Sequence, residues 1–162
     1  MKPEYVKPPD GLPCPCGSGA LYSLCCEPLV TGRADAGTAL ALMRSRYTAY
    51  VLGEKAYLLA TWAPETCPED VEFGDPAPRW LGLRIHSSRN GNTGDDEGYV
   101  DFSATYLLDD SCWTLRETSR FLRQAGRWYY QNGESRTVRT KMQRNTHCPC
   151  GSGRKFKRCC GR

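Results

Sequence analysis

The chain has 162 residues, of which 40% are hydrophobic and 25% charged, and these values are typical of folded proteins rather than disordered ones. This length accommodates one domain of about 100–120 residues together with two small modules. No apolar run approaches the roughly 20 residues that span a bilayer, and no apolar segment of a signal peptide follows Met1. We therefore expect a cytoplasmic protein without membrane insertion.

Charge is distributed unevenly along the chain. Residues 134–162 contain nine basic side chains and one acidic one, a net charge of +8, whereas residues 1–133 contain 13 basic and 17 acidic side chains, a net charge of −4. A basic terminal segment predicts an acidic partner, either a protein surface or a nucleic acid. The alternative interpretation is a solvated basic tail that has no partner.

A flexible arm is expected over residues 1–12, and a cysteine motif with the spacing C-x-C-x8-C-C follows within residues 13–28. The same motif recurs within residues 147–162, again with the core Pro-Cys-Gly-Ser-Gly and with an aromatic residue at the same offset. The glycines of this core allow a sharp turn, since glycine accepts positive φ angles. Such a turn brings the four sulfurs of each motif toward one point, and we expect one metal ion per motif.

Chelation satisfies four neighbouring thiols at once, and disulfides are uncommon in a reducing compartment. Redox-active disulfides are the alternative interpretation. All-sulfur ligation suits zinc and also suits iron. Four protein ligands leave no open coordination position, so each metal is expected to be structural and to supply the folding energy of its short module. The predicted ligands are Cys14, Cys16, Cys25 and Cys26 in the first motif and Cys148, Cys150, Cys159 and Cys160 in the second.

The two motifs differ in the residues that do not ligate. Leu21 and Leu24 of the first motif are apolar, and they predict that the first module docks on the rest of the protein. The corresponding segment of the second motif is basic and contains one aromatic residue, which predicts a surface that recruits an acidic partner. The residues of this expected partner-binding surface are Arg154, Lys155, Phe156, Lys157 and Arg158.

A middle domain is expected over residues 34–133, with helices first and strands after them. Apolar residues at helical spacing predict a helix over residues 40–51, capped by Asp35 or Thr38. A second, shorter helix is expected over residues 56–62 and is followed by a proline-rich loop.

Strands are predicted in the second half of the middle domain by apolar residues that alternate with polar ones. A long hairpin loop is expected over residues 87–98, and a turn at Asn132-Gly133 is expected to close the domain before a basic linker at residues 134–146. This order of elements indicates an α+β domain whose helices cover one face of an antiparallel sheet. The alternating runs are Leu81, Leu83 and Ile85; Val100, Phe102, Ala104, Tyr106 and Leu108; and Trp113, Leu115, Glu117, Ser119 and Phe121.

The second cysteine motif resembles the SEC-C motif, the zinc module in the tail of the SecA translocation ATPase. Segments of the middle domain, with a SEC-C motif at each end, resemble the bacterial YchJ family. This resemblance implies a cone-shaped domain similar to nuclear transport factor two, in which a curved antiparallel sheet follows N-terminal helices. The resemblance of the second motif to the SecA tail implies an acidic partner such as the export chaperone SecB, or the ribosome. The segments that carry the family resemblance are residues 42–47, 57–58, 61–62, 80–83, 119–122 and 128–130.

Glu117 is a carboxylate in phase with the apolar residues of its predicted strand, so its charge must be paired or its pKa perturbed. Together with Trp62 it is the candidate for ligand binding or weak acid–base chemistry in the cavity of the cone. The alternative is a buried structural ion pair with Arg44 or Arg46. Ala63 stands where the family usually has a histidine, which removes one candidate catalytic group. A surface role is expected for His86, and inert thiols are expected at Cys67 and Cys112. His147 directly precedes the second motif, where four cysteines already suffice as ligands, so we expect it to support the metal site indirectly or to have an incidental position.

Two functions agree with these features. The first is a zinc-binding or iron-binding adaptor, linked by resemblance to protein export or nascent-chain handling, whose second motif binds an acidic protein surface. The alternative is a small-molecule-binding protein or enzyme that uses the cavity of the middle domain. Nucleic acid ranks below a protein partner, because residues 134–162 have no stacking aromatics beyond Phe156.

Overall fold

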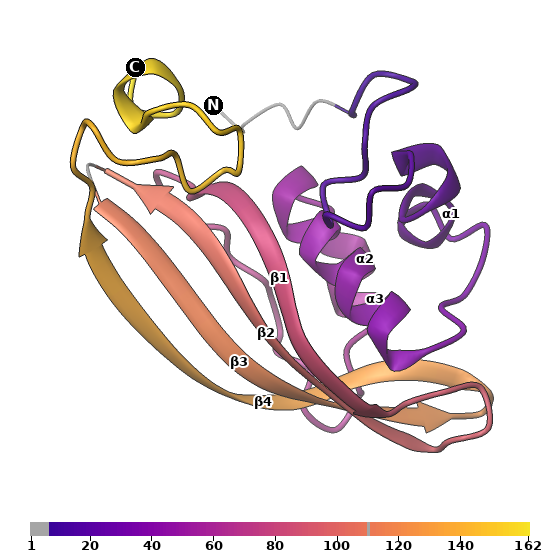
Figure 1. Ribbon diagram of the computed structural model, residues 1–162. Helices are drawn as coiled ribbons and strands as arrows, with labels where there is room; N and C mark the ends of the chain where they lie inside the picture. The colour runs from indigo at the N-terminus through magenta and orange to yellow at the C-terminus, as the bar shows by residue number, and fades with distance from the viewer. Residues whose placement is uncertain (1–6, 110) are drawn as a thin grey trace.

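The computed structural model describes residues 7–109 and 111–162 and confirms the α+β architecture. Four antiparallel strands form one sheet in the order β1-β2-β3-β4, and Figure 1 shows this sheet curving around the helices. The two cysteine modules lie at the same end of the molecule, one beside the helices and one beyond the last strand. The longer elements are α1 (Glu27–Val30), α2 (Ala39–Leu52), α3 (Lys55–Ala60), β1 (Arg79–Asn90), β2 (Glu97–Leu108), β3 (Ser111–Gln124) and β4 (Arg127–Lys141).

Helix α2 is the centre of the hydrophobic core. Of its two candidate caps the structure uses Thr38, whose Oγ1 accepts a hydrogen bond from the Ala41 backbone N–H at 3.1 Å. The helix ends at Gly53, which has a φ of 70° and therefore closes it in the left-handed conformation. Leu42 of α2 packs in one cluster with Val100 and other residues of the sheet, so burial of these side chains holds the helix against the concave face. Among the described residues, no helix is long and apolar enough to cross a membrane.

The helix predicted over residues 56–62 corresponds to α3, which ends earlier, at Ala60. The residues that follow Ala60 pair with β4 instead of continuing the helix. The Tyr130 backbone N–H donates to the Thr61 carbonyl at 2.9 Å, and the Ala63 N–H donates to the Tyr130 carbonyl at 2.8 Å. Trp62 therefore lies beside the sheet rather than in a helix, with its ring 5.0 Å from that of Tyr130.

For the first strand, the prediction of which side chains face the core is wrong at one position. Alternation placed Leu81 with Leu83 and Ile85, but the structure packs Trp80, Leu83 and Ile85 against the core. The register of β1 against β2 shifts between Trp80 and Gly82, so one extra residue breaks the alternation. This bulge turns the Trp80 ring toward α2.

The turn predicted at Asn132-Gly133 is also wrong, and so is the linker predicted directly after it. Strand β4 runs through both residues to Lys141 and pairs with β3 along this length, so at most residues 142–146 connect the sheet to the second motif. Asparagine-glycine favours a hairpin only when the strands on either side pair with each other, whereas here both sides pair with β3. The hairpin loop expected over residues 87–98 is also shorter than predicted. Strand pairing continues into it from both sides, since β1 extends to Asn90 and β2 begins at Glu97.

Candidate metal centres

The first cysteine module is a tight turn held by backbone hydrogen bonds. The Cys14 N–H donates to the Ala20 carbonyl at 2.8 Å, and the Gly17 N–H donates to the Cys14 carbonyl at 3.1 Å. Gly17 has a φ of 74°, which is a conformation that residues with a side chain rarely adopt. The short 3-10 helix η1 (Tyr22–Leu24) then returns the chain, and Cys25 donates its N–H to the Tyr22 carbonyl at 3.1 Å.

The second module repeats these bonds almost one for one. The Cys148 N–H donates to the Arg154 carbonyl at 2.7 Å, and the Gly151 N–H donates to the Cys148 carbonyl at 3.2 Å. The 3-10 helix η2 (Phe156–Arg158) occupies the place of η1, and the Cys159 N–H bonds the Phe156 carbonyl at 3.0 Å. The identical spacing in the sequence therefore produces the same local fold twice.

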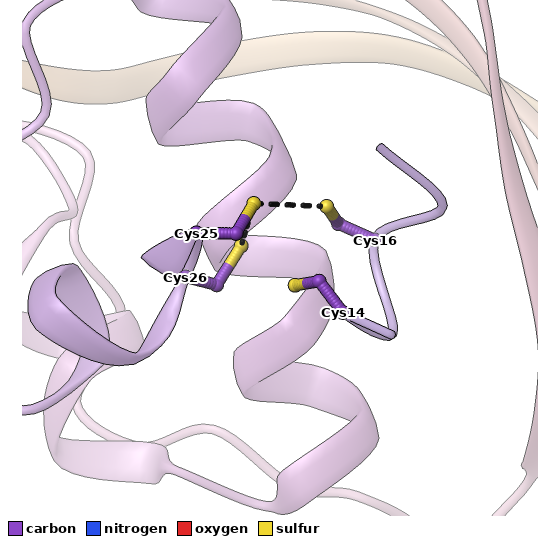
Figure 2. A group of neighbouring side chains, drawn as sticks. All are labelled: Cys14, Cys16, Cys25 and Cys26. Carbon is purple, nitrogen blue, oxygen red and sulfur yellow. Dashed lines mark hydrogen bonds between the residues drawn. The ribbon is translucent and has the colours of Figure 1, made fainter. Parts of the chain in front are cut away.

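Each module brings its four sulfurs into one cluster. In both clusters the sulfur atoms all lie within 4.8 Å of one another, and Figure 2 shows the two pairs of the first cluster pointing toward a common centre. The Cys16–Cys25 and Cys25–Cys26 sulfur separations are 3.6 and 3.9 Å. The corresponding separations in the second cluster are 3.5 and 3.9 Å.

These distances fit a metal ion and not a disulfide. A tetrahedral ion with bonds of about 2.3 Å to sulfur has S···S edges of about 3.8 Å, whereas a disulfide has an S–S bond of about 2.05 Å. All ten cysteines are free thiols. Four thiolates form a soft donor set that fills a tetrahedral coordination shell, so a bound ion would crosslink the two ends of each module and would have no position for a substrate.

A serine in each module contacts the cluster at the same place. The Ser18 Oγ lies 3.2 Å from the Cys25 sulfur, and the Ser152 Oγ lies 3.2 Å from the Cys159 sulfur. Hydrogen bonding from the Ser152 side chain is the main cause that lowers the pKa of the Cys150 thiol to about 6. The lowered pKa favours a thiolate near neutral pH, which is the form that binds a metal. This contact could have been predicted from the sequence, because both serines lie in the repeated Pro-Cys-Gly-Ser-Gly core.

The two modules differ in their surroundings. The first belongs to the hydrophobic core, and its Cys16 and Cys26 side chains are 0% and 1% exposed. Helix α2 supports it with two polar contacts: Arg44 Nη1 donates to the Cys16 carbonyl at 2.9 Å, and Thr48 Oγ1 lies 3.8 Å from the Cys14 sulfur. Nothing in the sequence marked Thr48, because its contact joins residues 34 positions apart.

The predicted means of docking is wrong, although the first module does dock. Leu24 is 78% exposed and Leu21 is 40% exposed, so neither leucine anchors the module. Tyr22 is 5% exposed and takes that place together with the cysteines. Among the three residues of the short helix η1, Tyr22 alone is buried.

The second module lies at the edge of the protein. Cys148 is buried, but the other three cysteines are only partly covered. Its recorded side-chain contact with the sheet is a hydrogen bond of 3.4 Å from Arg79 Nη1 to the Cys160 carbonyl. The predicted partner-binding residues form its outer part: Arg154, Lys155 and Arg158 are exposed, and Phe156 and Lys157 are half-buried.

The paired modules and the intervening sheet agree with known proteins. The family described as "YchJ, middle NTF2-like domain" matches residues 38–133, and the SEC-C motif matches residues 12–28 and 144–162. The chain belongs to the YchJ family. A UPF0225 protein of Pectobacterium carotovorum is 48% identical over 91% of this chain and 97% of its own length. Another UPF0225 protein, from Photorhabdus laumondii, is 42% identical over 91% of this chain and 98% of its own.

Two solved structures resemble this YchJ-family chain. A SEC-C motif containing protein from Rhodopseudomonas palustris has a TM-score of 0.65 and 32% identity, and the match covers 76% of this chain and 98% of that one. A second SEC-C motif containing protein, from Psychrobacter arcticus, has a TM-score of 0.62 and 27% identity over 94% of this chain and 97% of that one. These likenesses confirm the family and the fold that the sequence predicted.

The other candidate functional residues of this YchJ-family protein are not part of either sulfur cluster. Glu117 and Trp62 line one cavity on the concave face of the sheet. The His86 Nε2 lies 2.6 Å from the Ser103 Oγ on the exposed face. His147 forms a backbone bridge with Lys155, and its ring is not part of the second sulfur cluster.

The two cysteines outside the motifs are also separate from the clusters. The Cys67 thiol contacts the Leu59 and Pro68 carbonyls at 3.8 and 3.4 Å. Cys112 is buried in β3, and burial raises the pKa of its thiol. The environment of Cys112 therefore does not activate a thiolate, since nucleophilic cysteines have lowered pKa values.

Proposed function

We propose that this protein is an adaptor with two structural zinc ions, in which the second module and the end of β4 form a basic surface for an acidic protein partner. The observation that carries the proposal is the unequal placement of two identical modules. The first is built into the core, whereas the second presents cations to solvent. A module used only for stability has no need of that exposure.

No side chain of this surface forms an ion pair within 4.0 Å in the described parts of the chain. Ion pairs recorded for residues 7–109 and 111–162 involve other arginines and lysines. Unpaired cations gathered on one surface attract an anionic surface and accelerate association. Phe156 adds an aromatic side chain at the centre, which supports binding because charge pairs at a surface contribute little each. The basic surface comprises Lys141, Arg144, Arg154, Lys155, Lys157 and Arg158.

The resemblance to the SecA tail supports an export chaperone as the partner, with the ribosome as the second candidate. Calorimetric titration of the zinc-loaded protein with purified SecB should detect binding that weakens with salt. The double variant Lys155→Glu/Lys157→Glu should bind about tenfold more weakly or not at all. Arg89→Glu reverses one exposed charge near the far end of β1 and should bind as the parent does.

Other outcomes identify the error in the proposal. Binding that the double variant and salt leave unchanged would reject the basic surface. Tight association with RNA, lost steeply with salt, would replace the protein partner by a nucleic acid. Co-sedimentation with ribosomes in the absence of SecB binding would select the second candidate.

The metal is tested separately. Anaerobic isolation without chelators, followed by elemental analysis, should give about two equivalents of zinc per chain for two four-thiolate sites. Iron in place of zinc would correct the metal and leave the adaptor role standing. Less than one equivalent of any metal would overturn the structural role of both modules.

A further inference from the structure

The concave face of the sheet contains a cavity of about 230 Å³ that neither sulfur cluster touches. Its walls come from α2, from the sheet and from Trp62, which follows α3. The volume is about that of eight waters at roughly 30 Å³ each, so it accommodates a molecule of one or two rings. The aromatic residues of its lining are Tyr47, Tyr50, Trp62, Trp80, Phe102 and Tyr130.

A buried cation lies at one side of this cavity. Arg46 is 4% exposed, and its guanidinium lies 4.9 Å from the Trp62 ring centroid and 4.7 Å from that of Tyr130. Its recorded hydrogen bonds all start from Nη1, which donates to the Leu58 carbonyl and to Thr61 Oγ1, both at 2.7 Å. The guanidinium carries further N–H donors on Nε and Nη2, and these are available to an acceptor in the cavity.

A carboxylate lies at the other side. Glu117 Oε1 accepts hydrogen bonds from the Ser119 hydroxyl at 2.6 Å and from the Tyr130 hydroxyl at 2.9 Å. Both recorded bonds go to the same oxygen, so Oε2 keeps its capacity to accept. Gly133 makes room for this side chain, since a Cβ there would collide with the Glu117 carboxylate. The glycine that the sequence suggested as a turn therefore has a positional use in β4.

Two further observations point to a missing molecule. Trp62 Nε1 is shielded from solvent and has no hydrogen-bond partner among the described residues, which is costly for an N–H donor. Arg46 and Glu117 line the same cavity, yet they are absent from the ion pairs recorded within 4.0 Å in the described chain. The structural ion pair considered from the sequence is thus not formed directly. Tyr130 contacts both groups instead, with its ring 4.7 Å from the Arg46 guanidinium and its hydroxyl donating to Glu117 Oε1.

We propose that this cavity binds a small, neutral, planar heteroaromatic lactam, a ring that carries a carbonyl acceptor beside an N–H donor. The ring packs between aromatic walls, its carbonyl accepts from Trp62 Nε1 and Arg46, and its N–H donates to Glu117. The opposite charges of Arg46 and Glu117 disfavour both anions and cations, since each ionic ligand would meet one like charge in a poorly solvated space. This site is independent of the basic surface.

The test uses the full-length, zinc-loaded protein and four single-ring probes: 2-pyridone as the lactam, benzoate as an anion, benzamidine as a cation and toluene as a ring without a polar edge. The indole N–H resonance of Trp62 reports binding directly. 2-Pyridone should shift this resonance saturably and bind about tenfold more tightly than each of the other three. Lys155→Glu/Lys157→Glu should bind it unchanged, which separates this site from the proposed partner surface.

Three variants probe the named contacts. Glu117→Gln should weaken 2-pyridone binding by about fivefold to tenfold, since it loses one hydrogen-bonding function and keeps its shape. Trp62→Phe should weaken binding by at least as much, since it removes the indole N–H and part of the aromatic wall. The Trp62→Phe titration is followed through the N–H resonance of Trp80. Gly133→Ala should weaken binding by displacing the carboxylate, whereas Gly82→Ala, at a site with open space beside it, should not. Far-UV circular dichroism and the melting temperature establish that each variant is folded.

Several results would overturn the proposal. One is the absence of any Trp62 shift with 2-pyridone at concentrations up to about 20 mM, a weak limit even for a single ring. Equal or tighter binding of benzoate or benzamidine would assign the cavity to an ion, and equal binding of toluene would show a purely apolar hollow. Unchanged affinity in folded Glu117→Gln and Trp62→Phe would place the probe elsewhere.

Discussion

The two cysteine modules have the same hydrogen bonds and the same sulfur spacings, but they differ in what surrounds them. The first packs into the core beneath α2, whereas the second meets the rest of the protein at one edge. The cysteine motif therefore determines the local conformation of each module, whereas the surrounding protein determines whether the module is buried or exposed. In this chain one copy is part of the domain, and the other is an appended surface.

The largest expected difference concerns the ligands themselves. Cys16→Ser should destabilise the whole protein by at least about 4 kcal/mol, because structural zinc sites contribute roughly 10–16 kcal/mol and the zinc site proposed for the first cluster is continuous with the core. At about 2–4 °C per kcal/mol, the melting temperature should fall by about 8–16 °C. Cys150→Ser should lower the main transition by no more than about 3 °C. Equal losses in the two variants, measured by calorimetry, would show that the second module is also integral to the core.

The two modules should lose their metal ions at different times when a chelator is added. A chelator should extract the ion of the second module first, since three of its cysteines are only partly covered while three of the first set are fully buried. Native mass spectrometry should detect a one-metal species. Hydrogen exchange of that species should rise in residues 148–160 and stay low in residues 14–26. The reverse order of deprotection would contradict the assignment of the first module to the core.

Support from α2 should affect the first module alone. Thr48→Val removes the hydroxyl 3.8 Å from the Cys14 sulfur. Loss of such a contact typically costs 10–100-fold in metal affinity, and the length of this one suggests about tenfold. Competition with a chromophoric chelator should detect a weaker first site and an unchanged second site. If both sites weakened together, the variant would be acting through global stability.

The smallest effect should be the same in both modules. Ser18→Ala and Ser152→Ala each remove a hydroxyl 3.2 Å from a ligand sulfur. Each should weaken its own site by a similar factor of about three to ten, since the contact is local and repeated. The same competition assay measures both variants. A large difference between them would mean that burial changes the value of this contact.

Much of this structure could be predicted because the information is local. The spacing of cysteines, the turn glycines and the alternation along β2 and β3 all act within a few residues. The errors arose where distant segments decide the outcome. A bulge turned Trp80 toward the core, and pairing with β3 kept Gly133 inside a strand. No single segment contains those constraints.

The amino-acid sequence by itself determined the family, the two clusters of four cysteines and the identical folding of both modules, because thiol spacing and positive φ angles restrict the chain locally. Only the tertiary structure decided which module is buried, that Tyr22 rather than two leucines anchors it, and that Arg46 and Glu117 border one cavity without meeting. Those features depend on how α2 packs against the curved sheet. Packing between segments far apart in the chain is a property of the whole fold, and a motif read alone does not encode it.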